Sequence, residues 1–356
     1  MVFICCIIGG AVLKIASSVI LPFVIAVLLA LVMFPLIIAL DKIRCPRFLS
    51  ILLIVIIVIT GMFLFGTVFF ISGSMVAEQI LDNESSLYAG RLELIFHEAA
   101  DLFNLETDDA QTLWQNLWDQ AVIRTFVQNF AISITNASFR FVTSAVLMLI
   151  FLVFILMEAS CFKMKLFTAF ENRIGNFDHM GNEIIRQVSR YLGAKFLFSL
   201  ANGIIYFIGF SLVGLQFAMV WAVIQFLLNF IPALGSITAG VTISLFALIQ
   251  FGPEQPGPII IVVAIILAVN LILSNLLDPK IIGNHVGLSP LVILISLSLW
   301  GYIWGFTGMV IAVPMTVIIK IICEHIPILE PVSVLIGSRK SVLKKKADME
   351  KAEVQP

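Results

Sequence analysis

Long apolar runs recur along this chain, and they constrain its fold more than any other feature. Residues 19–40, 48–71 and 259–277 contain no charged side chain, and each run is long enough to cross the ~30 Å hydrocarbon core of a bilayer as an α-helix. The chain is 60% hydrophobic and 12% charged, whereas a soluble domain has about 45–50% apolar and about 25% charged residues. The sequence therefore predicts an all-α, polytopic membrane protein.

Six segments fit full membrane spans, and the rest of the chain divides around them. We expect spans at 2–16, 19–40, 48–71, 140–157, 196–213 and 259–277. The predicted regions are N-terminal transmembrane helices (1–77), an amphipathic extracytoplasmic insert (78–139), a transmembrane helix with a cytoplasmic loop (140–195), a transport core (196–325) and a cytoplasmic tail (326–356). Within the insert, apolar residues recur at helical spacing and acidic residues predominate, which favours packing within an assembly over docking on anionic lipid.

The positions of lysine and arginine predict the topology. Basic residues gather in the loop at 41–47, in 163–195 and in the tail at 344–346, and short cytoplasmic loops carry such an excess. We therefore expect both termini in the cytoplasm and the acidic insert outside.

Two further apolar segments, 215–251 and 287–320, are each interrupted by proline and glycine. Each could form a pair of full crossings, giving 8–10 spans, or a re-entrant hairpin beside about six full spans. The distribution of basic residues does not distinguish the two models, because both contain an odd number of crossings after the fifth span and leave the tail in the cytoplasm. The pieces within these segments run about 11–19 residues, and a perpendicular span needs about 20 with about 17 as a lower limit. We therefore favour hairpins, the first entering from outside and the second from inside.

Paired, interrupted hydrophobic segments are the best sequence indication of a secondary transporter's binding site. Asp278, at the end of the 259–277 span, is the strongest single candidate, since a carboxylate there should face water, a cation or a partner. The predicted substrate or ion pathway comprises Asn229, Pro232, Gly235, Ser236, Thr238, Asn270, Asn275, Asp278 and Pro290. The alternatives are an interfacial Asp278 beside Lys280, and glycines and amides, Asn202 and Gln225 included, that serve helix packing.

No metal or cofactor is expected from the sequence. The five cysteines form no CxxC pair, and the four histidines are far apart with no HExxH motif. An intramembrane enzyme would need a nucleophile with a base, paired aspartates in apolar runs or a metal triad. None of these patterns is visible, so we do not expect an enzyme.

A family resemblance is carried by two stretches, NFIPALGSITAG (229–240) and LLDPKIIGNHVGLSPLVILISLSLWGYIWGFTGMVIAVPMTVIIK (276–320). Together they resemble the autoinducer-2 exporter family of PerM-type bacterial permeases. The resemblance lies in four patterns: the IPxxG break, an acidic-Pro-x-I-I-G stretch, LxPL and a GxxGMxxAVP ending. Asp278 replaces a glutamate-like position of that pattern, and Asn284 stands where a basic residue is expected.

The resemblance implies a multi-pass transporter of the bacterial cytoplasmic (inner) membrane, homo-oligomeric and linked to the quorum-sensing signal autoinducer-2. We expect alternating access for a small polar organic molecule, with the lipid bilayer as the other partner and no nucleic acid. Some relatives are described as sodium(lithium)/proton antiporters, so that function is an alternative, in which Asp278 would titrate. A membrane scaffold is a third, although it would not explain the paired interruptions.

Overall fold

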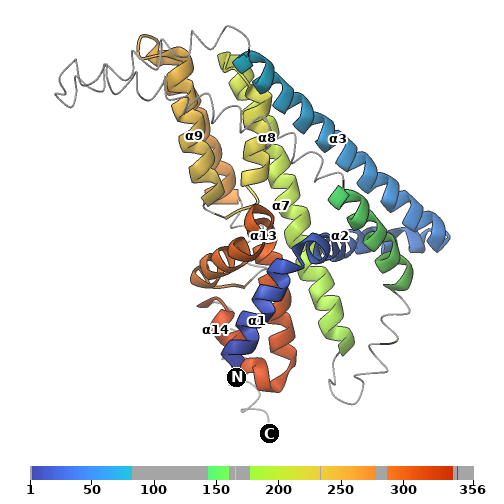
Figure 1. Ribbon diagram of the computed structural model, residues 1–356. Coiled ribbons are helices and arrows are strands. Elements are labelled where there is room, and N and C mark those ends of the chain that lie inside the picture. Colours follow the sequence, from blue (N-terminus) through green and yellow to red (C-terminus); the bar gives the residue numbers. More distant parts are fainter. Residues whose placement is uncertain are drawn as a thin grey trace. The chain divides into compact units, whose positions relative to one another are not determined.

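The computed structural model describes residues 2–81, 143–159, 165, 177–232, 234–277, 287–339 and 343 (Figure 1). These residues form helices and connecting turns, with a single isolated β-bridge between Leu288 and Gly337 and no strand among them. The predicted all-α class is confirmed. The amphipathic insert falls almost entirely on residues outside this set, so its helices stay a prediction.

Three helices begin the chain: α1 (Val2–Ile15), α2 (Ser17–Lys42) and α3 (Arg47–Leu81). The break between the first two lies at Ala16, where the sequence predicts it. However, α3 ends at Leu81 rather than at residue 71, because Ala77, Glu78, Gln79 and Leu81 are all good helix formers and no proline stops the helix. After the insert, Thr143–Ala159 forms an apolar helix close to the predicted span at 140–157.

The C-terminal half contains α7 (Phe177–Val213), α8 (Ala218–Leu228), α9 (Leu234–Phe251) and α10 (Pro256–Val269). It continues with η1, a π-helix at Asn270–Leu277, then α13 (Pro290–His325), the short 3₁₀-helix η2 (Pro327–Leu329) and α14 (Glu330–Ile336). Six helices in the described part of the chain are long and apolar enough to cross a membrane, as a multi-pass membrane protein requires.

The chain folds into two compact units. One comprises Met1–Ile59, Thr143–Leu197 and Leu277–Pro356, and the other comprises Thr60–Val142 and Phe198–Leu276. Helices α3 and α7 each contribute one part to each unit.

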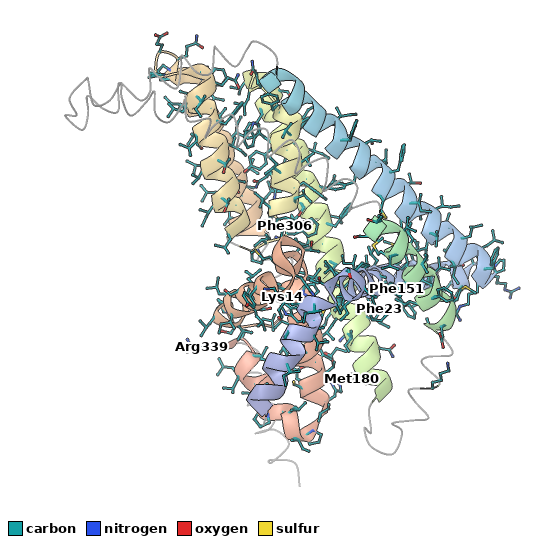
Figure 2. All side chains as sticks on the ribbon, in the orientation of Figure 1. Lys14, Phe23, Phe151, Met180, Phe306 and Arg339 are labelled. Atoms are coloured by element: carbon teal, nitrogen blue, oxygen red, sulfur yellow. The ribbon has the colours of Figure 1, made fainter. Side chains whose placement is uncertain are left out.

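In the first unit, α1 packs on α13, and so does α14. Lys14 is a charged residue inside the first apolar run (labelled in Figure 2). Its Nζ lies 3.9 Å from the centre of the Tyr302 ring, a cation–π contact that offsets part of the cost of placing the charge there. The indole Nε1 of Trp304 donates a 3.0 Å hydrogen bond to the Leu13 carbonyl. Phe23 of α2 meets Phe151 edge to face, with ring centroids 5.4 Å apart (Figure 2).

Helix α13 folds back on itself and is a helical hairpin. Its backbone leaves helical geometry at Trp304 (φ −125°, ψ 16°) and Gly305 (φ 62°, ψ −142°), and the second pair of angles is essentially restricted to glycine. Residues far apart along α13 then meet: Ser296 Oγ lies 3.1 Å from the Ala312 carbonyl oxygen and 2.5 Å from Thr316 Oγ1. The first arm, 290–303, is about 21 Å long at 1.5 Å per residue, which is shorter than the ~30 Å hydrocarbon core.

The second unit contains the other hairpin, formed by α8 and α9, with a turn at 229–232. A Cβ atom added to Gly235 would lie 1.7 Å from the Leu228 carbonyl oxygen, so the two arms approach closely at the turn. With 11 residues, α8 is about 16 Å long. Both interrupted segments are thus helical hairpins with one short arm, and the choice between re-entrant hairpins and paired crossings stays a prediction. Their depth in the bilayer stays a prediction.

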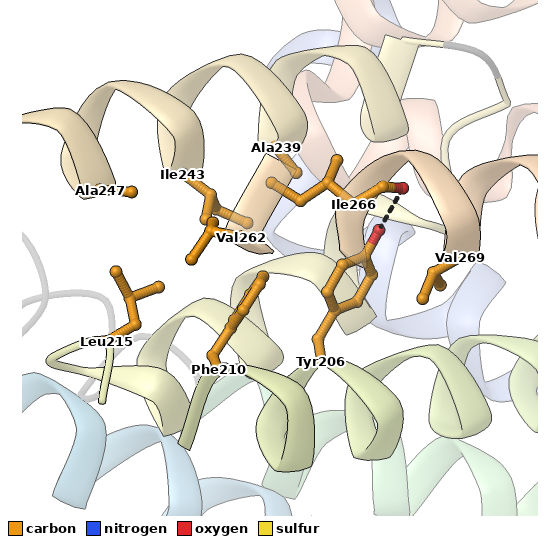
Figure 3. Close-up of a cluster of buried hydrophobic side chains, with 9 residues drawn as sticks. All are labelled: Tyr206, Phe210, Leu215, Ala239, Ile243, Ala247, Val262, Ile266 and Val269. Atoms are coloured by element: carbon orange, nitrogen blue, oxygen red, sulfur yellow. Dashed lines mark hydrogen bonds between the residues drawn. The ribbon is translucent and has the colours of Figure 1, made fainter. Parts of the chain in front are cut away.

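The core of the second unit joins α7, α9 and α10 (Figure 3). Ala239, Ile243 and Ala247 recur every four residues along α9 and are fully buried, and Val262 and Ile266 of α10 belong to the same cluster. Tyr206 and Phe210 of α7 complete its centre. Small residues on α9 allow close helix contact, which drives association in lipid, where burying apolar surface gains little.

Candidate transport site

The part of α7 within the second unit reverses the usual pattern of a soluble helix. Its buried face carries Ser199 and Asn202 together with Tyr206, spaced three and four residues apart, whereas large apolar side chains such as Ile204 and Phe207 are exposed. A helix with polar groups inside and apolar groups outside is stable only where the surroundings are apolar. This part of α7 therefore has one face for lipid and one polar face for the protein interior.

The α8–α9 hairpin brings a further amide to this polar face and buries a second one nearby in sequence. Asn229, the first residue of the hairpin turn, donates a 3.0 Å hydrogen bond from Nδ2 to Ser199 Oγ. The α7 backbone at Gly203 lies next to α8: a Cβ there would lie 3.4 Å from the Ala222 carbonyl oxygen, an ordinary van der Waals contact. Gln225 lies one helical turn before Asn229, on the buried face of α8.

These four side chains form what we call the amide cluster: Ser199, Asn202, Gln225 and Asn229, with relative exposures of 0%, 2%, 1% and 3%. Two of its polar atoms, Asn202 Oδ1 and Gln225 Nε2, have no hydrogen-bond partner in the described part of the chain. Leaving a buried polar atom unpaired costs about 1–3 kcal/mol, so each such atom in a native structure calls for an explanation. Asn202 thus carries an unpaired acceptor on α7, and Gln225 carries an unpaired donor on α8.

A second polar contact lies farther along α7. The Tyr206 hydroxyl is 3.4 Å from the Ile266 carbonyl oxygen (Figure 3), and it is also 3.4 Å from Asn270 Oδ1. Both distances are longer than a well-formed O–H···O hydrogen bond. Asn270 is the first residue of the π-helix η1. A π-helical segment is rare, and it occurs frequently at functional sites.

Of the predicted pathway residues, Asn229 and Asn270 contact the polar side chains of α7. Pro232 and Ser236 are half-buried at the hairpin turn, Gly235 is buried there, and Thr238 is exposed on α9. Pro290 is exposed at the start of α13, which belongs to the other unit. Asn275 falls in η1, but its side chain is not among those described, and Asp278 also lies outside the described residues.

Sequence reasoning did not select Ser199 or Tyr206, and it left two roles open for Asn202 and Gln225: bonding neighbouring helices or lining a polar route. Ser199, Asn202 and Tyr206 share one helical face within an apolar run, and that spacing was the available signal. The contact of this face with the α8–α9 hairpin depends on the turn at residues 229–232, which spacing along α7 does not reveal.

The amide cluster carries hydroxyl and amide groups and no charged group. Such groups bind polar molecules by hydrogen bonds and offer no general acid or base, so the cluster is equipped for recognition rather than for bond cleavage.

Comparisons with known proteins agree with a transport role. Residues 3–328 match the model of a family described as "AI-2E family transporter". A protein of Borreliella burgdorferi named "Putative transport protein" is 30% identical over 325 residues, covering 91% of this chain and 86% of its own length. A protein of Haemophilus influenzae with the same name is 29% identical, with 91% of each chain covered. The AI-2 transport protein TqsA of Escherichia coli K12 is 27% identical over 314 residues, or 88% of each chain.

The matched residues include the amide cluster, both hairpins and all six helices that could span a membrane, although the last of these helices ends near the limit of the match. The chain is a multi-pass membrane transporter and belongs to the AI-2E transporter family.

Proposed function

We propose that this protein moves a small, uncharged polar organic molecule across the bacterial inner membrane by alternating access, and that this molecule is the signal autoinducer-2. The observation that carries the proposal is the amide cluster, because it holds an unpaired acceptor and an unpaired donor within an apolar unit. A solute with hydroxyl groups would satisfy both atoms, and the hydrogen bonds it forms would offset its own loss of hydration. The name of the relative TqsA supports autoinducer-2 as that solute.

The composition of the amide cluster favours a neutral solute over a cation. Exchange of sodium or lithium for protons needs a carboxylate that binds the ion and titrates. None of the four side chains in the amide cluster is acidic. Asp278 remains the candidate for coupling to an ion, and the experiment below tests its role.

The two hairpins supply a mechanism for alternating access. Transporters with inverted repeats place the substrate beside broken helices and move one repeat against the other. Here the α8–α9 turn contributes Asn229 to the amide cluster, and α13 is the matching hairpin. In the proposed arrangement the two hairpins enter the membrane from opposite sides and open the site to each side in turn, within a homo-oligomer.

Flux measurements in proteoliposomes test the proposal. The wild-type chain should transport labelled autoinducer-2. Asn202→Leu and Gln225→Leu should each reduce the flux by about tenfold or more, since loss of one hydrogen bond of about 1.4 kcal/mol corresponds to a factor of ten. Thr242→Val is the matched control, because Thr242 is an exposed residue of α9 whose hydroxyl donates to the Thr238 carbonyl one turn earlier. Its flux should equal that of the wild type.

The same vesicles distinguish the alternatives. The antiporter would be established instead if the vesicles do not move autoinducer-2 but show sodium-driven proton flux, and if Asp278→Asn abolishes that flux. Absence of any flux from correctly folded oligomers would favour the scaffold. Unchanged autoinducer-2 flux in both leucine variants would exclude the amide cluster as the binding site.

A further inference from the structure

Two histidines and a glutamate lie close together in the first compact unit, although they come from helices far apart in the sequence, α7 and α13. His179 and Glu183 lie one turn apart near the start of α7, and His325 is the last residue of α13. One ligand atom from each residue lies within 4.8 Å of the others. Glu183 Oε2 is 4.0 Å from His179 Nδ1 and 3.8 Å from His325 Nε2.

The surroundings fix the orientation of two of these side chains. His325 Nδ1 is 2.9 Å from the Ile321 carbonyl oxygen, which can only accept a hydrogen bond, so Nδ1 carries the proton. In the neutral ring Nε2 then presents its lone pair toward Glu183. Gln187 Nε2 donates a 2.9 Å hydrogen bond to Glu183 Oε1 and leaves Oε2 directed at both histidines. Metal-binding histidines typically hold their second ring nitrogen in this way, and metal-binding carboxylates are in turn hydrogen-bonded.

The distances fit metal ligands better than a hydrogen-bonded ion pair. An N–H···O hydrogen bond spans about 2.7–3.2 Å, and both histidine–glutamate distances are longer. Two ligands of one tetrahedral Zn²⁺, each bonded at about 2.0–2.1 Å, lie roughly 3.4 Å apart. The two glutamate–histidine distances therefore need to close by about half an ångström around an ion, and the histidine–histidine distance, at most 4.8 Å, by up to about 1.4 Å. Side-chain rotation of the exposed His179 provides such a movement.

We propose that His179, Glu183 and His325 form a binding site for Zn²⁺ or a similar divalent transition metal, with water as the fourth ligand. Two imidazoles and one carboxylate are a ligand set that zinc accepts. The neighbouring Glu324 lies 3.3 Å from Lys320 and forms an ion pair with it, so it is not assigned to the metal. A bound ion would tie the first turns of α7 to the end of the second arm of the α13 hairpin. This site is independent of the amide cluster and of the identity of the transported solute.

Metal titration of the tag-free, chelator-treated full chain in detergent tests the site. Zn²⁺ should bind at one strong site per chain, measured by competition with a chromogenic chelator, and it should raise the thermal unfolding midpoint. His179→Ala, Glu183→Gln and His325→Gln should each weaken Zn²⁺ binding by at least about tenfold, as the loss of a residue that merely supports a metal ligand already does.

The controls separate loss of binding from loss of fold. His179 is exposed, so His179→Ala should match the wild type in its metal-free unfolding midpoint and lose only the rise caused by Zn²⁺. Glu254→Gln removes an exposed carboxylate between α9 and α10 and should bind Zn²⁺ as the wild type does. Wild-type affinity in all three ligand variants, or the absence of strong Zn²⁺ binding to the wild type, would overturn the proposal.

Discussion

Gln250 shows how much of this fold depends on single polar side chains. This amide is buried near the end of α9 and binds the backbone of the α7–α8 loop at two points. Its Nε2 donates to the Gly214 carbonyl at 2.9 Å, and its Oε1 accepts from the Gln216 N–H at 2.7 Å. The loop contains two residues with positive φ, Gly214 at 78° and Phe217 at 56°. A regular helix cannot pair the backbone groups of such a loop, so the Gln250 side chain pairs them.

We predict that Gln250→Met lowers the free energy of unfolding by about 1–2 kcal/mol, because it keeps the side-chain volume but leaves the Gln216 N–H unpaired. Equilibrium unfolding in mixed detergent micelles measures this change. Gln216→Met is the control, since the bond to Gln250 comes from the Gln216 backbone, and this variant should stay close to the wild type. Equal stability of the two variants would contradict the assigned role of Gln250.

Residue types in the sequence identified part of the candidate site. Asn229 stood out because it begins the proline- and glycine-rich break, and the structure places it against Ser199. Ser199 lies 30 positions earlier, in a helix with no break, where nothing in its local sequence distinguishes it from a packing serine. The proximity of His179 and His325 could not be predicted from the sequence either, because only the fold brings α7 and the end of α13 together.

Among the helices, the two hairpins, α8–α9 and α13, are the elements that depart most from simple membrane spans. Both were predictable, because proline and glycine in an apolar run disrupt helical hydrogen bonding wherever the run folds. Their close packing was not predictable. In α13 a Cβ on Gly308 would lie 1.9 Å from the Trp300 carbonyl oxygen, so the arms touch backbone to backbone near the turn, as they do at Gly235 in the other hairpin.

We predict that Gly235→Ala destabilises the α8–α9 hairpin. The added methyl group would overlap the Leu228 carbonyl and force the arms apart, at a cost of about 1–3 kcal/mol or more. Thermal unfolding in detergent should show a lower midpoint, and proteoliposomes should show a matching loss of flux. Gly193→Ala on α7 is the control, because no atom lies within 4 Å of the position its Cβ would take. A Gly235→Ala variant as stable as Gly193→Ala would exclude the close approach of the arms.

For the whole molecule, the charge distribution predicts the orientation in the membrane. Lys42, Arg44 and Arg47 flank the turn between α2 and α3, and positive charge in such short loops favours the cytoplasmic side. The acidic segment 78–139 would then lie outside.

Cysteine labelling in spheroplasts checks this orientation. Cys45 lies in the basic turn and is partly exposed, so a variant that keeps only Cys45 should resist a membrane-impermeant maleimide until the membrane is permeabilised. Asp108→Cys in a cysteine-free background should react before permeabilisation. Reaction of Cys45 in intact spheroplasts would reverse the predicted topology.

The sequence by itself determined the all-α class, the approximate helix positions and the two fold-backs. The bilayer imposes these features segment by segment, since each spanning helix must satisfy its own backbone and reach the required length. Only the tertiary structure decided which polar side chains meet. Lipid-facing and core-facing surfaces are both apolar, so hydrophobic periodicity does not show how a membrane helix is rotated. The orientation of α7 that buries Ser199 and Asn202 is fixed by tertiary contacts such as the hydrogen bond from Asn229 of the hairpin turn to Ser199.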